Sequence, residues 1–449
     1  MDALAFVPQF GGFLYMIASF VIALSVIVAV HEYGHYIVGR WSGIHAEVFS
    51  IGFGPVLWSR VDKHGTRWQV AALPFGGYVK FLGDADAASG KDGAAMEAVA
   101  ADPEALRRTM HGAPLWARSA TVAAGPVFNF VMSAAIFTAV ALSQGVMRDP
   151  LTIGGLAPLP GVENGLQEGD ELITAGGVPV PSFLDETAWE AFRTAVPQQQ
   201  PLDYQVRRGD AEVSVSGPYL YPPLVRGVAP RSAASDAGLK PDDVIVAVDG
   251  TQIVSFDQLK VHVEAADGKV LVLDVWRDGQ QVEMSLAPRR TDEPQPDGSF
   301  ATRWRIGIIG GLAFEPATEA AGFGESLAAG SYQVWAVVDT SLSGLKHMIT
   351  GAISTCNLSG PIGIAETSGT MASQGAESFI RFIAVLSTAV GLLNLFPVPA
   401  LDGGHLMFYA YEAVAGRPPS DRAVRVLMSL GIAIVLSLMV FALGNDLFC

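Results

Sequence analysis

The chain has 449 residues, of which 50% are hydrophobic and only 16% are charged. This composition is too apolar for an ordinary soluble enzyme of this length, so we expect membrane-spanning segments. The formal net charge of -16 argues against a nucleic-acid partner, because phosphate contacts require clustered Lys and Arg. The two cysteines, Cys356 and Cys449, form no CxxC pair, and the sequence does not say whether they bond to each other.

Four apolar stretches are long enough to cross the roughly 30 Å hydrocarbon layer as helices. They cover about residues 11–30, 118–142, 379–396 and 424–443. The first is not expected to be a cleaved signal peptide, because Asp2 precedes it and no basic residue does. Nearly all the acidic residues lie between the stretches at the two ends, which predicts a membrane core with a soluble insert.

Basic residues next to the predicted spans indicate their orientation, since cytoplasmic ends carry an excess of Lys and Arg. Arg40 follows the first span, Arg118 precedes the second, and Arg417, Arg422 and Arg425 lie between the third and fourth. We expect these ends to face the cytoplasm. Both termini and the insert then face the opposite side of the membrane.

The end of the first predicted span carries an HExxH motif, with His31, Glu32 and His35. Histidines four residues apart lie on one face of a helix and can reach one metal ion, while the glutamate faces the open coordination position. The motif arises by chance in roughly one chain of this size in a hundred. Polar groups at the end of an apolar span are costly, however, and are rarely present without a partner or a task. We therefore predict a zinc site.

A catalytic zinc needs a third protein ligand and leaves its fourth position for water. The segment 394–404, which follows the third span, sets the single carboxylate of Asp402 among prolines and glycines. Irregular backbone at membrane depth is tolerated only where protein or water surrounds it. Alternatively, Asp402 caps the next helix at a turn that leaves the bilayer. The HExxH motif on the same predicted side favours Asp402 as the third ligand.

HEYGH on the first span together with NLFPVPALDG after the third resembles the site-2 protease family of intramembrane zinc metalloproteases. The resemblance covers essentially the whole chain, and further matching segments are 50–54, 73–80, 124–130 and 358–364. It implies a bacterial inner-membrane enzyme that cleaves single-span membrane proteins, such as anti-sigma factors or leftover signal peptides. In this family an upstream site-1 protease often cuts the substrate first. A cytoplasmic fragment is then released.

Between the first two spans, residues 56–61 and 66–72 predict a β-hairpin around the turn at Gly65. Its strand edge could hold an unwound substrate by main-chain pairing, as the resemblance implies, or the hairpin could merely pack on the membrane surface. His45, His64 and His111 are expected at the surface rather than as ligands. Residues 84–105, rich in Ala, Gly and Asp, are interpreted as a mobile insert.

The soluble insert contains an internal repeat, because residues 165–173 align with residues 238–246. Both copies resemble circularly permuted bacterial PDZ domains, which are small β-rich modules. The resemblance implies that the pair filters substrates by size, and peptide binding along a strand edge is the alternative. Residues 327–353 are apolar at helical spacing but contain Asp339, Lys346 and His347, which favours a helix along the outer lipid interface over a fifth span.

The predicted fold is thus a multi-span α-helical membrane protein with four transmembrane helices, a membrane-associated β-hairpin region and two inserted β-rich PDZ domains. Its domains are the first transmembrane helix with HExxH (1–40), the cytoplasmic-side β region and mobile insert (41–113), the second transmembrane helix (114–145), the two PDZ domains (150–221 and 222–290), a periplasmic linker with amphipathic helices (291–373), the third transmembrane helix with the Asp402 loop (374–410), and the cytoplasmic connection with the fourth transmembrane helix (411–449).

The mechanistic hypothesis is that His31, His35 and Asp402 hold Zn²⁺ while Glu32 takes a proton from water and delivers it to the leaving amine. By resemblance and by its place near the ligand loop, Asn394 binds the substrate backbone or the developing oxyanion; a buried amide tying two helices together is its alternative. Asn129, in the second span, is interpreted as a helix-packing residue.

Two other classes of protein are weighed against the protease. One is a membrane-anchored PDZ scaffold with a structural zinc site, which is expected to close its fourth position with a further ligand. The other is a transporter with a metal site at the membrane midplane. It would normally show more spans and an internal membrane repeat.

Overall fold

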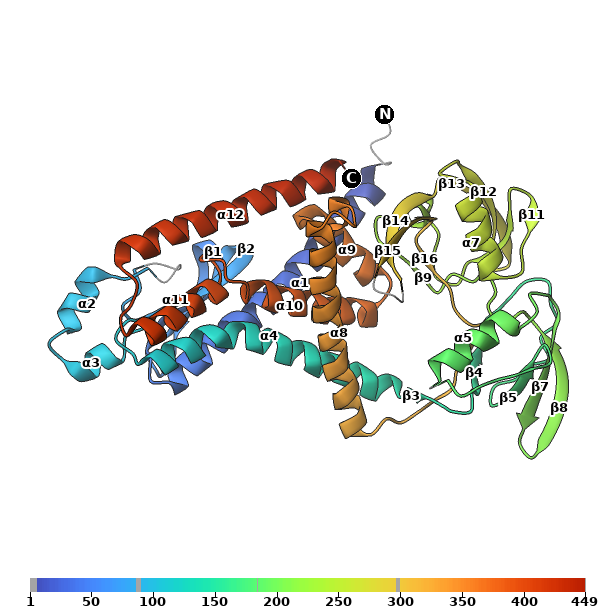
Figure 1. Ribbon diagram of the computed structural model, residues 1–449, viewed down its shortest axis with the longest axis horizontal. Coiled ribbons are helices and arrows are strands. Elements are labelled where there is room, and N and C mark those ends of the chain that lie inside the picture. Colours follow the sequence, from blue (N-terminus) through green and yellow to red (C-terminus); the bar gives the residue numbers. More distant parts are fainter. Residues whose placement is uncertain (1–5, 86–89, 184, 296–298, 449) are drawn as a thin grey trace. The chain divides into compact units, whose positions relative to one another are not determined.

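The computed structural model describes residues 6–85, 90–183, 185–295 and 299–448. They divide into two compact units, which are described separately. The first unit contains residues up to 140, together with 323–349 and the chain from 355 onward. The second contains residues 141–322 and 350–354. Figure 1 labels the elements of both.

Four helices of the first unit are long and apolar enough to cross a membrane, counting only the described residues. They coincide with the four predicted stretches, and the first continues without a break through the HExxH motif. Pro126 lies inside the second of these helices without ending it. The four helices are α1 (Phe6–Trp41), α4 (Leu115–Gln144), α10 (Ala376–Asn394) and α12 (Asp421–Phe448).

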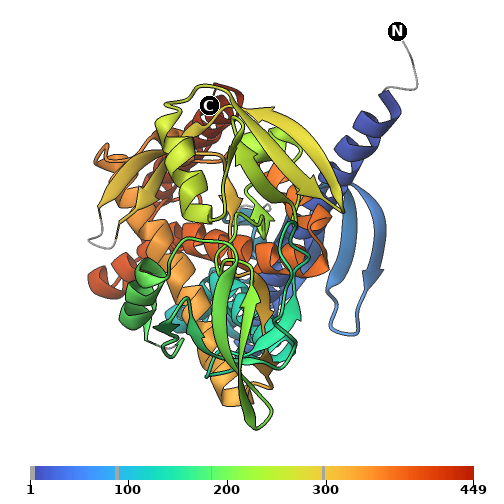
Figure 2. The same ribbon diagram turned by 90° about the vertical axis from the view of Figure 1, so that its right-hand side faces the viewer.

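A long antiparallel hairpin of β1 (Ala46–Val61) and β2 (Arg67–Phe81) packs against α1, as Figure 2 shows in light blue. The predicted hairpin is confirmed in position, but both strands extend well beyond the predicted bounds. Residues 48–51 of β1 pair on one side with 77–80 and on the other with 67–70 of β2, so the two long strands bend back to form more than one ladder. Among the hairpin side chains that the structure describes, seven large apolar ones are exposed: Phe53, Val56, Leu57, Trp58, Val61, Val70 and Leu73.

The Asp62 carboxylate organises the hairpin turn. It accepts hydrogen bonds from the backbone N–H groups of His64 (2.8 Å) and Thr66 (3.1 Å) and from Trp68 Nε1 (3.0 Å). Burial raises the pKa of Asp62, but these hydrogen bonds outweigh it and lower the pKa to about 2. The Trp68 ring then packs edge-on against Tyr36 of α1, with centroids 5.0 Å apart. This contact fixes the hairpin beside the HExxH turn.

The segment interpreted as a mobile insert contains two short helices among its described residues, α2 (Gly93–Val99) and α3 (Pro103–Arg107). Asp92 and Asp102 cap their first turns through side-chain hydrogen bonds. Next to this segment, the buried carboxylate of Asp84 pairs with His111 Nε2 at 3.2 Å. Burial raises the pKa of Asp84. Of the three histidines expected at the surface, His64 is exposed and His45 and His111 are half-buried.

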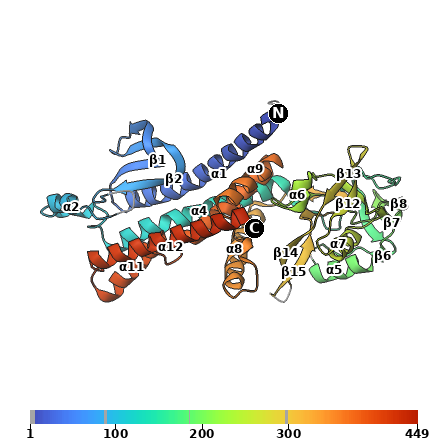
Figure 3. The same ribbon diagram turned by 90° about the horizontal axis from the view of Figure 1, so that it is seen from above.

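The rest of the first unit follows the insert in sequence. α8 (Phe323–Ile349) has 27 residues and is not one of the four described helices that are apolar enough to cross a membrane. It packs through the buried Gly330 against α4, where a Cβ would lie 2.4 Å from Thr138 Oγ1. The remaining described helices are η2 (Thr355–Asn357), α9 (Pro361–Ser373) and α11 (Asp402–Ala415). α9 and α11 are labelled in the view from above in Figure 3.

The C-terminal turn of α12 is tied to the start of α9. The Asp446 carboxylate accepts hydrogen bonds from the backbone N–H groups of Gly360 (2.9 Å), Ile362 (3.0 Å) and Gly363 (3.1 Å). Cys356 in η2 is disulfide-bonded. The only other cysteine of the sequence, Cys449, lies outside the described residues.

In the second unit, the internal repeat corresponds to two four-stranded sheets with the same strand order, β6-β5-β7-β8 and β11-β10-β12-β13. Each sheet packs on its own hydrophobic core. The first repeat contains β5 (Glu171–Ala175), β6 (Val178–Pro179), α5 (Glu186–Ala195), β7 (Leu202–Arg208) and β8 (Ala211–Gly217), and the second contains α6 (Ala233–Ala237), β10 (Val244–Val248), β11 (Thr251–Gln252), α7 (Phe256–Ala265), β12 (Leu271–Arg277) and β13 (Gln280–Leu286).

The two repeats also share a buried ion pair at equivalent positions. Asp170 is held by Arg208 Nε at 2.7 Å, and Asp243 by Arg277 Nε at 2.6 Å. Asp170 and Asp243 occupy the same position in the aligned segments, so the sequence repeat is a structural repeat.

Short strand pairs complete the second unit, and some join segments from its two ends. They are β3 (Val146–Met147) with β18 (Thr318–Glu319), β4 (Ile153–Leu156) with β17 (Phe314–Pro316), β9 (Gly227–Val228) with β16 (Ile308–Ile309), and β14 (Arg289–Pro294) with β15 (Phe300–Arg305).

Candidate metal centre

Two imidazoles from α1 and one carboxylate from the start of α11 converge on a single point. His31 Nε2 lies 3.1 Å from His35 Nε2 and 3.1 Å from Asp402 Oδ2. His35 Nε2 lies 3.5 Å from the same carboxylate oxygen. The structure thus brings together the three residues that the sequence predicts as ligands, and they are the only group of this kind among the described residues.

The sequence around Asp402 explains how α11 starts at this point. The turn between α10 and α11 folds back tightly on the first residues of α11. A Cβ at Gly403 would lie 2.3 Å from the Phe396 carbonyl oxygen, and a Cβ at Gly404 would lie 2.3 Å from that of Val398. Only glycine permits such close backbone contacts. The Asp-Gly-Gly sequence therefore places the Asp402 side chain at the entrance of the helix.

α4 forms the wall of the centre opposite α11. Gly34 of α1 is in contact with α4, because its Cβ would lie 2.5 Å from the Ala124 carbonyl oxygen. Gly125 of α4 faces the imidazoles, because its Cβ would lie 2.4 Å from His35 Nε2 and 2.8 Å from His31 Cε1. Two glycines thus allow α1 and α4 to approach closely and let the imidazoles lie against α4.

The outer nitrogens of both imidazoles contact α4. His35 Nδ1 lies 2.8 Å from the Thr121 carbonyl oxygen, and His31 Nδ1 lies 3.2 Å from Asn129 Nδ2. The backbone carbonyl oxygen of Asn129 also accepts a hydrogen bond from Ser387 Oγ on α10 at 3.1 Å. Asn129 therefore packs helices through its backbone, as expected, and also contacts His31 through its side chain. The contact with His31 was not predicted from the sequence. The one feature that pointed to it was a polar amide inside an apolar span.

Glu32 lies on the side of α1 that faces the hairpin. Its carboxylate accepts a hydrogen bond from the backbone N–H of Val79 in β2. Its Cγ lies so close to Gly77 that a Cβ there would be 3.2 Å away. The neighbouring strand therefore holds the glutamate in position beside His31.

The residues present fit a zinc ion. Asp402 Oδ2 is buried and has no hydrogen-bond partner among the described residues, which is costly unless a cation completes its surroundings. Two imidazole nitrogens and one carboxylate oxygen are a donor set that zinc takes in catalytic sites. The His31, His35 and Asp402 donor atoms lie 3.1 to 3.5 Å from one another, close enough to share one ion.

Asn394 is the last residue of α10 and is half-buried. Its side chain makes no hydrogen bond to any residue that the structure describes. Among the described residues, no hydrogen bond of the Asn394 side chain therefore links two helices, as the alternative role would require.

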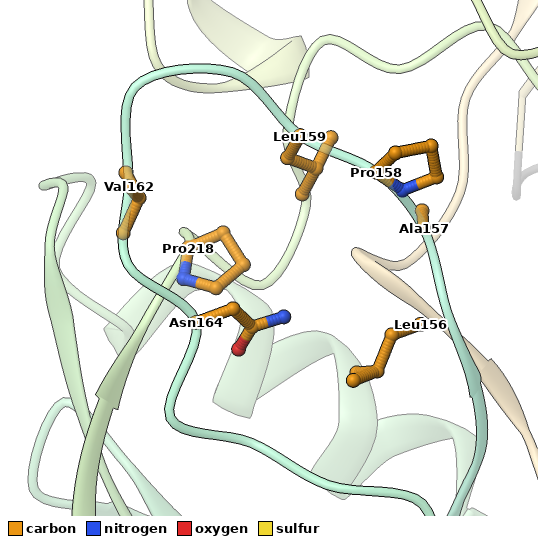
Figure 4. A pocket seen from close by; sticks show the side chains of 7 residues that line it. All are labelled: Leu156, Ala157, Pro158, Leu159, Val162, Asn164 and Pro218. Carbon is orange, nitrogen blue, oxygen red and sulfur yellow. The ribbon is translucent and has the colours of Figure 1, made fainter.

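A separate cavity of about 350 Å³ lies in the second unit and is shown in Figure 4. Apart from the amide of Asn164, its lining side chains are apolar: Leu156, Ala157, Pro158, Leu159, Val162 and Pro218. Because no titratable side chain lines it, this cavity offers no group for hydrolysis.

Four apolar helices of membrane length and a two-histidine, one-carboxylate cluster beside a glutamate define the class of intramembrane metalloproteases. Residues 19–438 match the model of Peptidase family M50, and the chain belongs to that family. The resemblance to site-2 proteases and the expected zinc cofactor are thereby confirmed. The chain is a zinc-dependent intramembrane protease, not a scaffold or a transporter.

Curated relatives agree with this assignment. The chain is 37% identical over 434 residues to a protein of Rhizobium meliloti (strain 1021) named as a zinc metalloprotease, with 96% of each chain covered. It is 32% identical over 474 residues to the regulator of sigma-E protease RseP of Escherichia coli (strain K12), with 97% of this chain and 98% of that one covered. A solved PDZ domain from Listeria monocytogenes matches 22% of this chain at 17% identity with a TM-score of 0.16, which is too low to assign a fold.

Proposed function

We propose that His31, His35 and Asp402 are the protein ligands of the catalytic zinc and that Glu32 is the general base. The convergence of three donor atoms from α1 and α11 supports this assignment. The single observation that carries it is the buried Asp402 oxygen that lacks a hydrogen-bond partner between two imidazoles. Three ligands, rather than four, are found in the described part of the chain, which favours a catalytic site over a structural one.

Zinc held there supplies a Lewis acid that polarises a peptide carbonyl and makes water acidic near neutral pH. Glu32 takes the proton of the attacking water on its carboxylate and delivers it to the nitrogen of the leaving amine. The hydrogen bond from Val79 keeps that carboxylate directed beside His31. Asn394, at the end of α10, binds the substrate backbone or the developing oxyanion, and its lack of an internal hydrogen bond leaves its amide available.

The substrate must present an unwound segment to this site, because a helix has no free main-chain groups. In the sheet of β1 and β2, residues 48–51 pair on both sides, with 77–80 and with 67–70, so the edges without a strand partner among the described residues are 56–61 and 77–81. We assign to this sheet the role of holding the unwound segment by main-chain pairing. The contact between Glu32 and β2 supports it, because a segment paired with the hairpin would run close to the general base.

The substrates in this proposal are single-span membrane proteins of the anti-sigma factor type or leftover signal peptides, first shortened by an upstream site-1 protease. In this proposal the metal centre lies toward the cytoplasmic side of the bacterial inner membrane, which the basic residues Arg40 and Arg118 at the neighbouring span ends support. The two structural repeats are PDZ domains on the periplasmic side and exclude substrates with large outer domains. The shared sheet order of the repeats supports two similar modules.

The test is the Glu32→Gln variant, which keeps the shape of the side chain but removes its basicity. The purified variant should bind one zinc like the wild type and should lose cleavage of a single-span reporter by at least about a hundredfold. His31→Ala is the companion variant and should lose the zinc itself. Normal cleavage by Glu32→Gln would refute the role of Glu32, and normal zinc binding by His31→Ala would refute the ligand set.

A further inference from the structure

In the contact between Asn129 and His31 two nitrogen atoms face each other. Both carry hydrogen when His31 binds a metal through Nε2, so neither can accept a hydrogen bond from the other. We propose that Asn129 is a positioning residue whose Oδ1, with its amide turned by 180°, accepts a hydrogen bond from the Nδ1–H of His31 and so directs the Nε2 lone pair at the metal. This inference rests on the proposed metal centre.

The ligating atom of His31 determines where its proton must be. Its Nε2 is the atom that faces both His35 and Asp402, at 3.1 Å from each contact atom. A neutral imidazole that binds metal through Nε2 carries its hydrogen on Nδ1. That Nδ1–H needs an acceptor, yet the atom at 3.2 Å is the amide nitrogen of Asn129, which is itself only a donor.

The other atom of the same amide has the complementary problem. Asn129 Oδ1 is buried and has no hydrogen-bond partner among the described residues. Rotation of the amide about the Cβ–Cγ bond exchanges oxygen and nitrogen without changing the space that the side chain fills. It brings an acceptor to the Nδ1–H of His31, so the donor-donor contact disappears and the oxygen gains a partner.

His35 shows the same arrangement without ambiguity. Its Nδ1 lies 2.8 Å from the Thr121 carbonyl oxygen, which can only accept. His35 therefore carries its hydrogen on Nδ1 and leaves Nε2 free for the metal. Thr121 and Asn129 lie about two turns apart on α4. This helix thus supplies one acceptor to each imidazole, the usual outer support of a metal-binding histidine.

The surroundings of Asn129 give its side chain little freedom to move away. The residue is fully buried, and its backbone carbonyl oxygen accepts hydrogen bonds from Ser133 Oγ (2.9 Å) and Ser387 Oγ (3.1 Å). Across the interface, a Cβ at Gly391 would lie 3.2 Å from Asn129 Cβ. The packing role therefore belongs to the backbone carbonyl, and the side-chain amide remains available to orient His31.

The experiment measures zinc affinity by chelator competition on the purified full-length protein, together with the visible spectrum of its Co²⁺-substituted form. Asn129→Asp keeps the shape and an acceptor oxygen. Asn129→Leu keeps the size without an acceptor, and Asn129→Ala removes the group without adding volume in case the leucine does not fold. Ser133→Ala is the packing control, because it removes a hydrogen bond to the Asn129 carbonyl and leaves the amide intact.

We expect Asn129→Leu and Asn129→Ala to lower zinc affinity by about 10- to 100-fold and to alter the Co²⁺ spectrum. Asn129→Asp and Ser133→Ala should stay within a few-fold of the wild type. Wild-type affinity in both Asn129→Leu and Asn129→Ala, or an equal loss in Ser133→Ala, would overturn the inference while leaving the metal centre intact. A wild-type protein that binds no zinc would instead overturn the proposed centre and this inference with it.

Discussion

Asp402 Oδ2 lies 3.1 Å from His31 Nε2, although the two residues stand near opposite ends of the sequence. The contact depends on glycines at both sides of the centre. Gly403 and Gly404 start α11 at the right place, and Gly34 and Gly125 let α1 and α4 meet. A metal centre inside a helical bundle therefore requires close backbone approach as much as it requires ligands.

Gly125 gives the first prediction. Gly125→Ala places a methyl group 2.4 Å from His35 Nε2 and 2.8 Å from His31 Cε1, so at least one imidazole must move. Zinc affinity should fall by tenfold or more, measured as the zinc-to-protein ratio after dialysis against a chelator. Gly444→Ala is the matched control, because its Cβ meets nothing within 4 Å in another apolar helix. Full zinc retention by Gly125→Ala would show that the close contact between Gly125 and the imidazoles is not needed for metal binding.

The ion pair between Arg118 and Glu412 gives the second prediction, because it joins α4 to the helix that carries Asp402. Two hydrogen bonds of 3.0 and 2.6 Å link the side chains, and the guanidinium lies 5.1 Å from the Tyr409 ring centroid. Removal of one partner from a pair this well buried should destabilise the fold by about 3 kcal/mol, measured by denaturant unfolding in detergent.

The exchanged double variant Arg118→Glu with Glu412→Arg should recover part of the lost stability. The comparable exchange of the exposed pair Arg381 and Glu377 should change stability by less than about 0.5 kcal/mol. If the buried double variant is no better than its worse single variant, the two side chains do not act as a pair.

Acid should weaken the first repeat through Asp170. Burial raises the pKa of this carboxyl, but hydrogen bonds from Arg208 and from the Gln167 N–H outweigh it and hold the pKa below its usual range. A depressed folded-state pKa contributes stability that is complete above the unfolded value of about 3.9 and is lost as pH falls through the folded value. The protection factors of the β7 amides in the full-length protein, which are corrected for the intrinsic pH dependence of exchange, should therefore fall below about pH 4.

Asp170→Asn should lower these protection factors at neutral pH and make them less dependent on pH. Asp210→Asn, at an exposed position in the turn after β7, should leave the profile unchanged. A wild-type profile that stays flat between about pH 5 and 2 would contradict the stabilising role given to Asp170.

The sequence allowed His31, His35 and Asp402 to be predicted because each belongs to a short motif whose spacing reflects local backbone geometry. The contact of Asn129 with His31 could not be predicted in this way, because it depends on how α4 rotates against α1. The extent of β1 and β2 was underestimated because Gly52 and Gly54, which have positive φ angles, interrupt the alternation of residues along β1. Asp92 and Asp102 cap the first turns of α2 and α3 and could have indicated these helices. The content of Ala, Gly and Asp instead favoured a mobile insert.

The zinc K-edge X-ray absorption spectrum of the purified protein tests the central claim most directly. The ligand set predicts two imidazole nitrogens and a carboxylate oxygen, at roughly 2.0 to 2.2 Å from the metal. Asp402→Ala should lose the zinc or change this spectrum, whereas Asn394→Ala should preserve it. A spectrum without two imidazoles, or one that is identical in Asp402→Ala, would contradict the convergence of α1 and α11 on one metal ion.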